Sequence, residues 1–384
     1  MSGGRITTPT RAATLSEYNY KNNIPSEIVI DNPISLSIRT LNRAKLCELL
    51  QDNKPYSKLS ERMEICDQSM RYSPLRVHII QPTATDTIVN NNGKRLRMNS
   101  GIEYLSENTK ERERFLRFNI QLQVDLGLDL ISIPYLRLPL NSYCQLVEDI
   151  ARNLRKQNRE PFIIFDLGYG KAEKFSDALS FFIKKVNISI IGFNYKSFTN
   201  HAVSYDVLSQ YIDKDVAFVM LNTERLDIIN NQISTMHYMP FLGNDVFAVK
   251  TPQFRGGSDP FAATKQKLSS MKLIKFFNPS NLIIEPAMLR VNKPRELLNE
   301  IHESSNMRLF DILSDYDAEN KDEDEYRVPV LRSLSKVHEL KSSTKEFGEL
   351  QKRVKSSEAS DYVREKRYLE SCLTNLRRTR TTHK

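Results

Sequence analysis

The segment Gly243–Pro252, with the sequence GNDVFAVKTP, decides how the rest of the chain is interpreted. Its centre, Val246–Val249, is a short apolar run typical of a buried strand, and a Gly-Asn-Asp turn precedes it. A cation, Arg255, and two glycines follow the proline. In a barrel of alternating strands and helices, residues at the carboxyl end of such a strand form the active site. We therefore expect the functional site close to this segment.

Similar apolar runs alternate with helical patterns through much of the chain. From residue 77 onward six strands are expected: Val77–Ile80, Leu128–Pro134, Phe162–Phe165, Ile188–Phe193, Val216–Leu221 and Val246–Val249. Two weaker candidates, Glu27–Ile30 and Leu36–Ile38, precede them, and residues 1–24 are expected to form a loop or an edge strand. Continuous apolar strands that alternate with helices indicate parallel strands covered by helices. The pattern therefore predicts an α/β fold, a (β/α)8 TIM-like barrel, in preference to an open sheet.

The carboxyl-terminal part of the chain has a different composition. Many acidic residues between Asp315 and Glu325 are typical of a solvated linker, and the pattern from Leu334 to Leu376 is helical and highly charged. We predict a barrel over residues 1–300, an acidic linker over 301–330 and a basic, charged helical appendage over 331–384.

The charge of the chain points to a polyanionic partner. A net charge of +9 and an isoelectric point near 9.2 suggest nucleic acid, although part of the charge lies in the basic tail, Arg377–Lys384. The four cysteines are widely separated, which is typical of reduced thiols in a cytosolic protein, and no close pair suggests a metal or redox centre. No secretory signal and no membrane-spanning run is evident. We predict a cytoplasmic protein without a metal or cofactor.

Three aspartates are the candidates for catalysis from the residues alone. Asp166 follows a predicted strand, Asp245 precedes one, and Asp86 lies in a loop. Carboxylates from different strand ends could converge as nucleophile and general acid/base. Helix capping or turn formation is the alternative role for each of them.

Basic residues in the predicted loops are the candidates for nucleic-acid binding. If they share one rim, they would follow a phosphate backbone, and a scattered, solvated set is the other reading. These residues are Lys94, Arg95, Arg97, Lys250 and Arg255.

Several short motifs, in a consistent order, resemble those of the tRNA-guanine transglycosylases. The segment Gln123-x-x-Leu126-Gly127-x-Asp129 is similar to that family's Gln-x-x-Leu-Gly-x-Asp. The matching segments elsewhere are Gly4-Arg5 with Pro9, Gly243-x-Asp245-x-Phe247 with Pro252, and His338-Glu339-Leu340. The resemblance implies a (β/α)8 barrel that exchanges a guanine in tRNA through a covalent aspartyl intermediate, and a zinc-bearing region that helps to bind RNA.

The departures from that family remove its chemistry. Its nucleophilic aspartate corresponds to Ala248, and its base-recognising aspartate corresponds to Tyr135. Of its zinc ligands only His338 is present. The inherited pocket would be lined by Tyr135, Gly168, Tyr169, Gly192, Phe193 and Ala248.

The resemblance and its departures together favour a non-catalytic role. We expect a transglycosylase-like barrel that binds tRNA or another nucleic acid, or that pairs with a catalytic transglycosylase subunit or with itself. An active, diverged transglycosylase or glycosidase with a relocated aspartate remains the alternative. A third reading is an unrelated barrel enzyme acting on a small phosphorylated metabolite.

Overall fold

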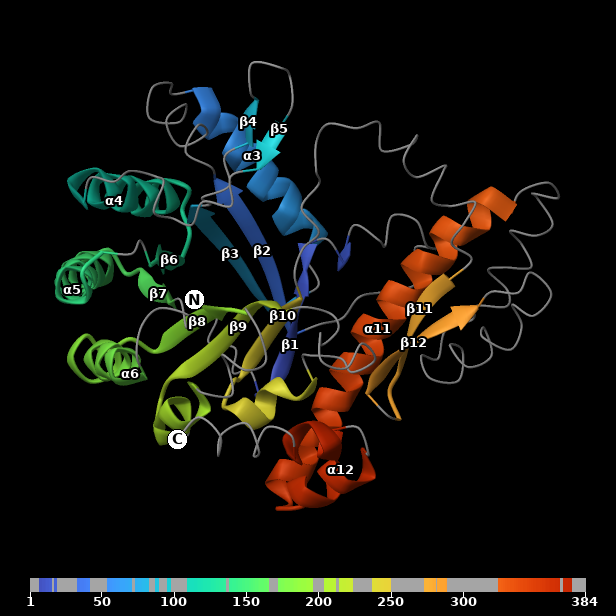
Figure 1. Cartoon of the computed structure of the whole chain (residues 1–384). Coiled ribbons are helices and arrows are strands. Elements are labelled where there is room, and N and C mark those ends of the chain that lie inside the picture. The colour runs from blue at the N-terminus through green and yellow to red at the C-terminus, as the bar shows by residue number, and fades with distance from the viewer. Residues whose placement is uncertain are drawn as a thin grey trace.

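A computed structural model gives the structure of the chain (Figure 1). It describes residues 7–15, 17–18, 33–41, 54–70, 73–82, 87–89, 95–97, 109–135, 138–165, 172–195, 204–211, 214–223, 237–249, 273–280, 282–288, 324–366 and 369–374.

Eight parallel strands form a nearly closed barrel, so the predicted fold class is confirmed. Their order in the sheet is β3-β2-β1-β10-β9-β8-β7-β6, which follows the chain around the barrel. The strands are β1 (Thr10–Thr14), β2 (Ile34–Leu41), β3 (Leu75–Pro82), β6 (Leu130–Pro134), β7 (Glu160–Phe165), β8 (Ile190–Asn194), β9 (Ala217–Thr223) and β10 (Val246–Val249).

The first strand corrects the prediction for residues 1–24. Strand β1 is paired on both sides, with β10 through Ala12 and Ala248 and with β2 through Ala12 and Ile34, so it is a central strand. Its sequence, TRAAT, lacks the large apolar residues that mark the other strands, and small side chains suit a crowded barrel interior. The predicted strand Glu27–Ile30 lies outside the described residues.

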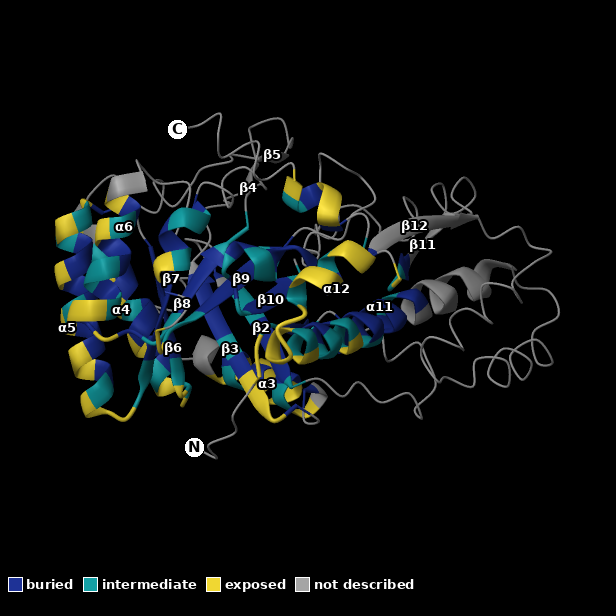
Figure 2. Cartoon of the chain, turned by 90° about the horizontal axis from the view of Figure 1, so that it is seen from below, coloured by how far each residue is buried: buried dark blue, intermediate teal, exposed yellow. Residues whose placement is uncertain are grey.

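Helices cover the outer face of the barrel (Figures 1 and 2). The long ones around the strands are α3 (Lys54–Ser69), α4 (Thr109–Asp125), α5 (Leu140–Lys156) and α6 (Ala172–Ser180), which continues as the π-helical turn η2 (Phe181–Lys185). Two short 3-10 turns, η3 (Ser209–Tyr211) and η5 (Met239–Leu242), precede β9 and β10. The described residues also form two antiparallel hairpins: β4 (Thr87–Val89) with β5 (Arg95–Arg97), and β11 (Leu273–Asn278) with β12 (Ile283–Met288). In the described part of the chain, no helix has the length and apolarity needed to cross a bilayer.

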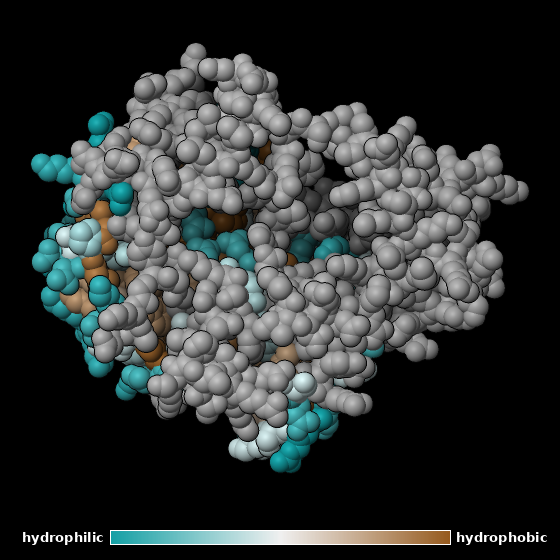
Figure 3. All heavy atoms as spheres, in the orientation of Figure 1, coloured by the Kyte–Doolittle hydropathy of each residue, from teal (hydrophilic) through white to brown (hydrophobic). Residues whose placement is uncertain are grey.

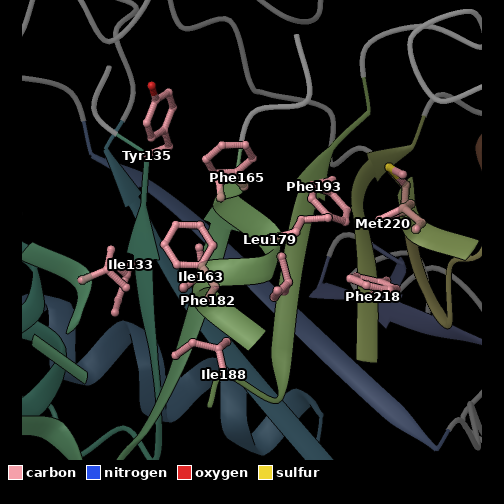
Figure 4. Packing of buried hydrophobic residues seen from close by; sticks show 14 of the residues in the cluster. Ile133, Tyr135, Ile163, Phe165, Leu179, Phe182, Ile188, Phe193, Phe218 and Met220 are labelled. Carbon is pink, nitrogen blue, oxygen red and sulfur yellow. The ribbon is translucent and has the colours of Figure 1, made fainter. Parts of the chain in front are cut away.

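The core has two layers, because successive strand residues point to opposite faces of the sheet. The outer layer packs strands against helices, and Figure 4 shows it for Ile163 and Phe193 against Leu179 and Phe182 of the α6–η2 segment. The inner layer fills the barrel with Ala12, Leu36, Ile79, Ile164, Leu221, Ala248 and neighbours. Each large apolar side chain buried in this way stabilises the fold by about 1.5–3 kcal/mol. On the outer surface the described residues over α4–α6, at the left of Figure 3, are largely hydrophilic.

The seam between β3 and β6 closes the barrel without a backbone ladder among the described residues. The side-chain amide of Gln123, from α4, occupies the place of a neighbouring strand: its Oε1 accepts from the Ser132 amide at 2.8 Å, and its Nε2 donates to the Ser132 carbonyl at 2.9 Å. On the other side the Ile80 carbonyl accepts from Ser132 Oγ at 3.0 Å and Asn119 Nδ2 at 3.2 Å. Buried backbone groups need such partners, so three polar side chains hold the seam.

The long carboxyl-terminal helix packs against the barrel as part of its outer layer. Helix α11 spans Asp324–Lys355 and therefore begins inside the predicted linker, and α12 (Ala359–Glu365) follows it. The ring of Phe347 stacks on Phe247 of β10 with centroids 5.4 Å apart, and Gln351 Nε2 donates to the Pro9 carbonyl at 2.7 Å. The rest of the linker, residues 301–323, lies outside the described residues.

Candidate functional site at the carboxyl ends of the strands

The carboxyl ends of β8, β9 and β10 lie side by side at the barrel mouth. This end of a parallel barrel is where connecting loops build active sites. Ala248 lies here, fully buried in the inner layer and paired with Ala12 of β1. The segment that decides the fold therefore ends at the expected place, and its inward residue carries only a methyl group.

A β-bulge in β9 lies directly opposite Ala248. Phe247 pairs with Met220 and Val249 pairs with Thr223, so Leu221 and Asn222 together face the single residue Ala248. Asn222 has a left-handed backbone, with φ of 55°. A bulge of this kind bends its strand and redirects a side chain, and bulges are frequent beside active sites.

The redirected Asn222 side chain joins a second asparagine from the neighbouring strand. Its Nδ2 donates to Oδ1 of Asn194, the last residue of β8, at 2.8 Å. Both side chains are partly exposed. Sequence reasoning did not single out this pair, although both asparagines directly follow apolar runs, Phe193 and Leu221, at two consecutive strand ends.

The floor below these amides is apolar. Gly192 lies on β8 opposite Ile164 of β7, and a Cβ at this glycine would come within 2.7 Å of Cζ of Phe162. The Phe162 ring therefore fills the space that a side chain at position 192 would take. Gly192 was predicted to line a pocket, and in the structure it makes room for an aromatic ring of the inner layer.

Two other predicted pocket residues, Tyr135 and Phe193, belong to the outer layer. Tyr135 packs edge-on against Tyr143 of α5 with centroids 4.8 Å apart, and its hydroxyl donates to the Leu138 carbonyl at 3.4 Å. Phe193 packs between Phe175 and Phe218, each with centroids 5.8 Å away. Figure 4 shows both within this layer, with the Tyr135 hydroxyl directed away from the other labelled side chains. The alternation of strand side chains places them on the helix side rather than in the mouth.

Asp245 lies at the amino end of β10, opposite to the mouth. Its carboxylate accepts from the Phe218 amide at 2.9 Å and from the Thr8 hydroxyl at 3.2 Å, so it ties β9 and the segment before β1 to β10. Burial raises the pKa of this carboxyl above its usual value, and the two hydrogen bonds oppose that shift. Residues at the amino end of a (β/α)8 barrel usually contribute to stability and not to catalysis. These contacts therefore favour a structural role for the Asp245 carboxylate over a catalytic one.

Arg95 and Arg97 are the first and last residues of β5, in the hairpin between β3 and α4. Outside the described residues lie Asp86, Lys94, Asp166, Gly168, Tyr169, Lys250 and Arg255.

His338 has partners for both ring nitrogens within the protein. Its Nε2 lies 3.0 Å from the Phe277 carbonyl of β11, and the Ser342 hydroxyl lies 3.3 Å from Nδ1. Burial lowers the pKa of this imidazole, which favours the neutral ring. His338 therefore joins α11 to the β11–β12 hairpin, and within the described residues no group of three potential ligands could hold a metal ion.

The solved structures that resemble this chain are similar to it in fold only. No protein-family model matches the chain, and no curated protein matches it. Among solved structures, the Escherichia coli homocysteine methyltransferase MmuM shares 11% identity at a TM-score of 0.41, over 62% of this chain and 79% of that one. The YdjI aldolase of Escherichia coli K12 shares 7% identity at 0.38, over 89% and 92%. The Salmonella typhimurium 3-hexulose-6-phosphate synthase shares 11% at 0.31, over 68% and 96%. None of these three is a tRNA-guanine transglycosylase.

Proposed function

We propose that this protein is a transglycosylase-like barrel that binds nucleic acid, or assists a catalytic subunit in tRNA base modification, without exchanging a base itself. The observation that carries the proposal is the burial of Ala248 in the inner layer at the mouth. A methyl group cannot attack a ribose carbon, because covalent catalysis needs an oxygen, nitrogen or sulfur nucleophile.

The other described residues around the mouth support the same reading. Among the described residues, the uncharged polar side chains near these carboxyl ends include Thr14, Gln81, Asn194 and Asn222. The Glu17 carboxylate accepts from the Thr14 hydroxyl at 3.0 Å and is paired with the buried Arg11. General acid/base catalysis needs a group that exchanges a proton near the working pH, and the four uncharged side chains do not titrate there.

Nucleic-acid binding is supported by charge and by position. The chain carries a net charge of +9, and the hairpin that contains Arg95 and Arg97 belongs to the connection that follows the carboxyl end of β3. Cations in such connections can reach a phosphate backbone that crosses the mouth.

The test measures base exchange and binding separately. The purified chain is mixed with tRNA and labelled guanine, alone and with an active tRNA-guanine transglycosylase. We expect no label incorporation by the chain alone, together with tRNA binding that weakens steeply as salt increases. Incorporation by the chain alone would contradict the proposal, and so would the absence of both tRNA binding and an effect on the active enzyme.

A charge-removal pair locates the binding surface. The double variant Arg95→Gln/Arg97→Gln removes two cations from the hairpin, and the matched control Lys156→Gln/Lys184→Gln removes two exposed cations from the opposite, amino end of the barrel. Each lost phosphate contact is expected to reduce the slope of log K against log salt by about 0.7–0.9. The hairpin variant should lose slope and the control should not, and equal losses would place the RNA elsewhere.

The alternative enzyme keeps one specific candidate. Asp166 is the residue that follows Phe165, the last residue of β7 and thus of a strand that ends at the mouth. If the protein hydrolyses or exchanges a base, the Asp166→Asn variant should bind tRNA as the wild type does and lose turnover.

A further inference from the structure

The asparagine pair at the mouth is unusual because of where its strained residue lies. Asn158 and Asn187 have nearly the same left-handed φ as Asn222, 56° and 57° against 55°. Those two directly follow the caps of α5 and η2, Gln157 and Val186, where a left-handed residue commonly ends a helix. Asn222 adopts this backbone inside strand β9, where it interrupts the regular pairing between β9 and β10.

The chemistry of the pair is that of a neutral recognition group. An asparagine amide carries two N–H donors and two acceptor lone pairs, so two amides that share one hydrogen bond keep three of each. This count is the same for either orientation of the two amides. The pair therefore presents donors and acceptors together and no charge, which suits a ligand edge that is itself half donor and half acceptor.

The surroundings restrict the shape of such a ligand. Beneath the amides lie apolar groups of the inner layer: the Phe162 ring beside Gly192, then Ile164, Leu221 and the Ala248 methyl. Binding sites for small molecules are largely apolar, with a few placed polar groups that fix orientation. An apolar floor with an amide rim favours a flat, uncharged ring over an anion or a sugar chain.

We propose that Asn194 and Asn222 form a recognition site for the edge of an uncharged planar heterocycle that carries a hydrogen-bond donor beside an acceptor, as a ring lactam does. The bulge opposite Ala248 serves to aim Asn222 at this edge. The inference rests on the proposed function, since a base of a bound nucleic acid is a ring of this class, and it assigns the recognition to amides instead of a carboxylate.

The experiment compares two probes that differ by one donor. Hypoxanthine has an N–H beside a ring carbonyl, and 1-methylhypoxanthine lacks that N–H. Binding of each to the full chain is measured by titration calorimetry. A site built to bond a donor discriminates strongly against the analogue that lacks it, because its own polar groups are then left unpaired. We expect hypoxanthine to bind at least tenfold more tightly.

The variants separate recognition from a purely structural bulge. Asn222→Gly keeps the left-handed backbone without strain and removes the amide, and Asn194→Ala removes its partner. The matched control, Asn187→Gly, makes the same change at nearly the same φ on the far end of the barrel. Asn222→Gly and Asn194→Ala should each weaken hypoxanthine binding at least tenfold, while Asn187→Gly should not change it and all three should unfold cooperatively near the wild-type temperature.

Three outcomes would overturn the inference: no hypoxanthine binding by the wild type, equal binding of both probes, or unchanged binding by both asparagine variants. The tRNA measurement described above separates this failure from that of the proposed function. Wild-type protein that binds tRNA but not hypoxanthine contradicts only the amide site, whereas protein that binds hypoxanthine but neither tRNA nor a catalytic subunit contradicts only the proposed function.

Discussion

The two ends of strand β10 differ in charge although they are only a few residues apart. At the amino end, the buried Asp245 carboxylate has a backbone amide and a hydroxyl as donors. At the carboxyl end, Ala248 has apolar neighbours in the inner layer and an uncharged asparagine pair across the bulge. The acidic residue at the amino end of β10 is therefore placed where it holds strands together, whereas the inward residue at the carboxyl end of the same strand is an uncharged alanine. The following predictions test that contrast, from the largest expected effect to the smallest.

Placing a carboxylate at the mouth is expected to cost the most. Ala248→Asp puts a charge at a fully buried position, and an uncompensated buried charge costs about 3–5 kcal/mol. Burial would raise the pKa of the new carboxyl, so stability should be retained at acidic pH and fall as pH rises. Chemical denaturation at several pH values measures this, with Ala248→Asn as the uncharged control. If the two variants are equally stable at neutral pH, the mouth can hold an anion and the contrast between the ends fails.

The barrel seam should be nearly as sensitive as the mouth. Gln123→Leu keeps the bulk of the side chain and leaves the Ser132 N–H and carbonyl without their partner, and each such group costs about 1–3 kcal/mol. The exposed Gln121, two positions earlier, donates to Asp125 on the same helix, so Gln121→Leu should change stability by about 0.5 kcal/mol or less. Denaturant midpoints of the two variants compare them directly, and similar midpoints would show that Gln123 does not hold the seam.

Filling the floor of the mouth should have an intermediate effect. Gly192→Ala brings a Cβ within 2.7 Å of the Phe162 ring, and overpacking of this kind costs about 1–3 kcal/mol. Gly348, in the interior of α11, has nothing within 4 Å of the same added atom, so Gly348→Ala should stabilise by about 0.5–1 kcal/mol. Opposite signs in thermal unfolding are expected. A tolerated Gly192→Ala would mean that the mouth contains free space.

The smallest change concerns the charge at the amino end. Because burial raises the Asp245 pKa, folding favours protonation of this carboxyl relative to the unfolded chain. The stabilisation that protonated Asp245 adds to the free energy of unfolding is therefore complete below the unfolded-state pKa, near 3.8. It is lost as pH rises through the folded-state pKa. Asp245→Asn keeps an acceptor for the Phe218 amide and should make stability less dependent on pH in that interval. Asp245→Ala removes the acceptor and should cost about 1–2 kcal/mol at every pH. An Asp245→Ala variant as stable as Asp245→Asn would rule out the structural role.

The sequence predicts the barrel well because its strands are continuous apolar runs between helical patterns. Strand β1 does not fit this pattern. A central barrel strand can have small and polar side chains when neighbouring strands carry large ones, as Ile34 does beside Ala12. Helix α11 was expected to stand apart because its charged surface hides the few side chains, such as Phe347, that attach it.

The strand that carries Ala248 was predicted with its observed bounds, while the side chains that surround its carboxyl end could not be derived from spacing alone. Phe193 is the residue before the last of β8 and Tyr135 directly follows β6, and only the alternation of inward and outward residues shows that both face helices. The bulge depends on pairing between distant segments, and its left-handed residue is an asparagine and not a glycine. No local sequence motif therefore predicts it. Two apolar runs that each end in asparagine are the one signal that sequence reading could have used.

The glutamine in the seam also constrains the order in which the protein can fold. A barrel closed by a strand ladder can form its ring from the sheet alone. Here the last junction lies between β3 and β6, and it needs side chains carried by α4. We therefore expect closure of the barrel at this junction to require α4 in its place. Without α4, β3 and β6 would be edge strands with unpaired backbone groups, and such edges promote aggregation.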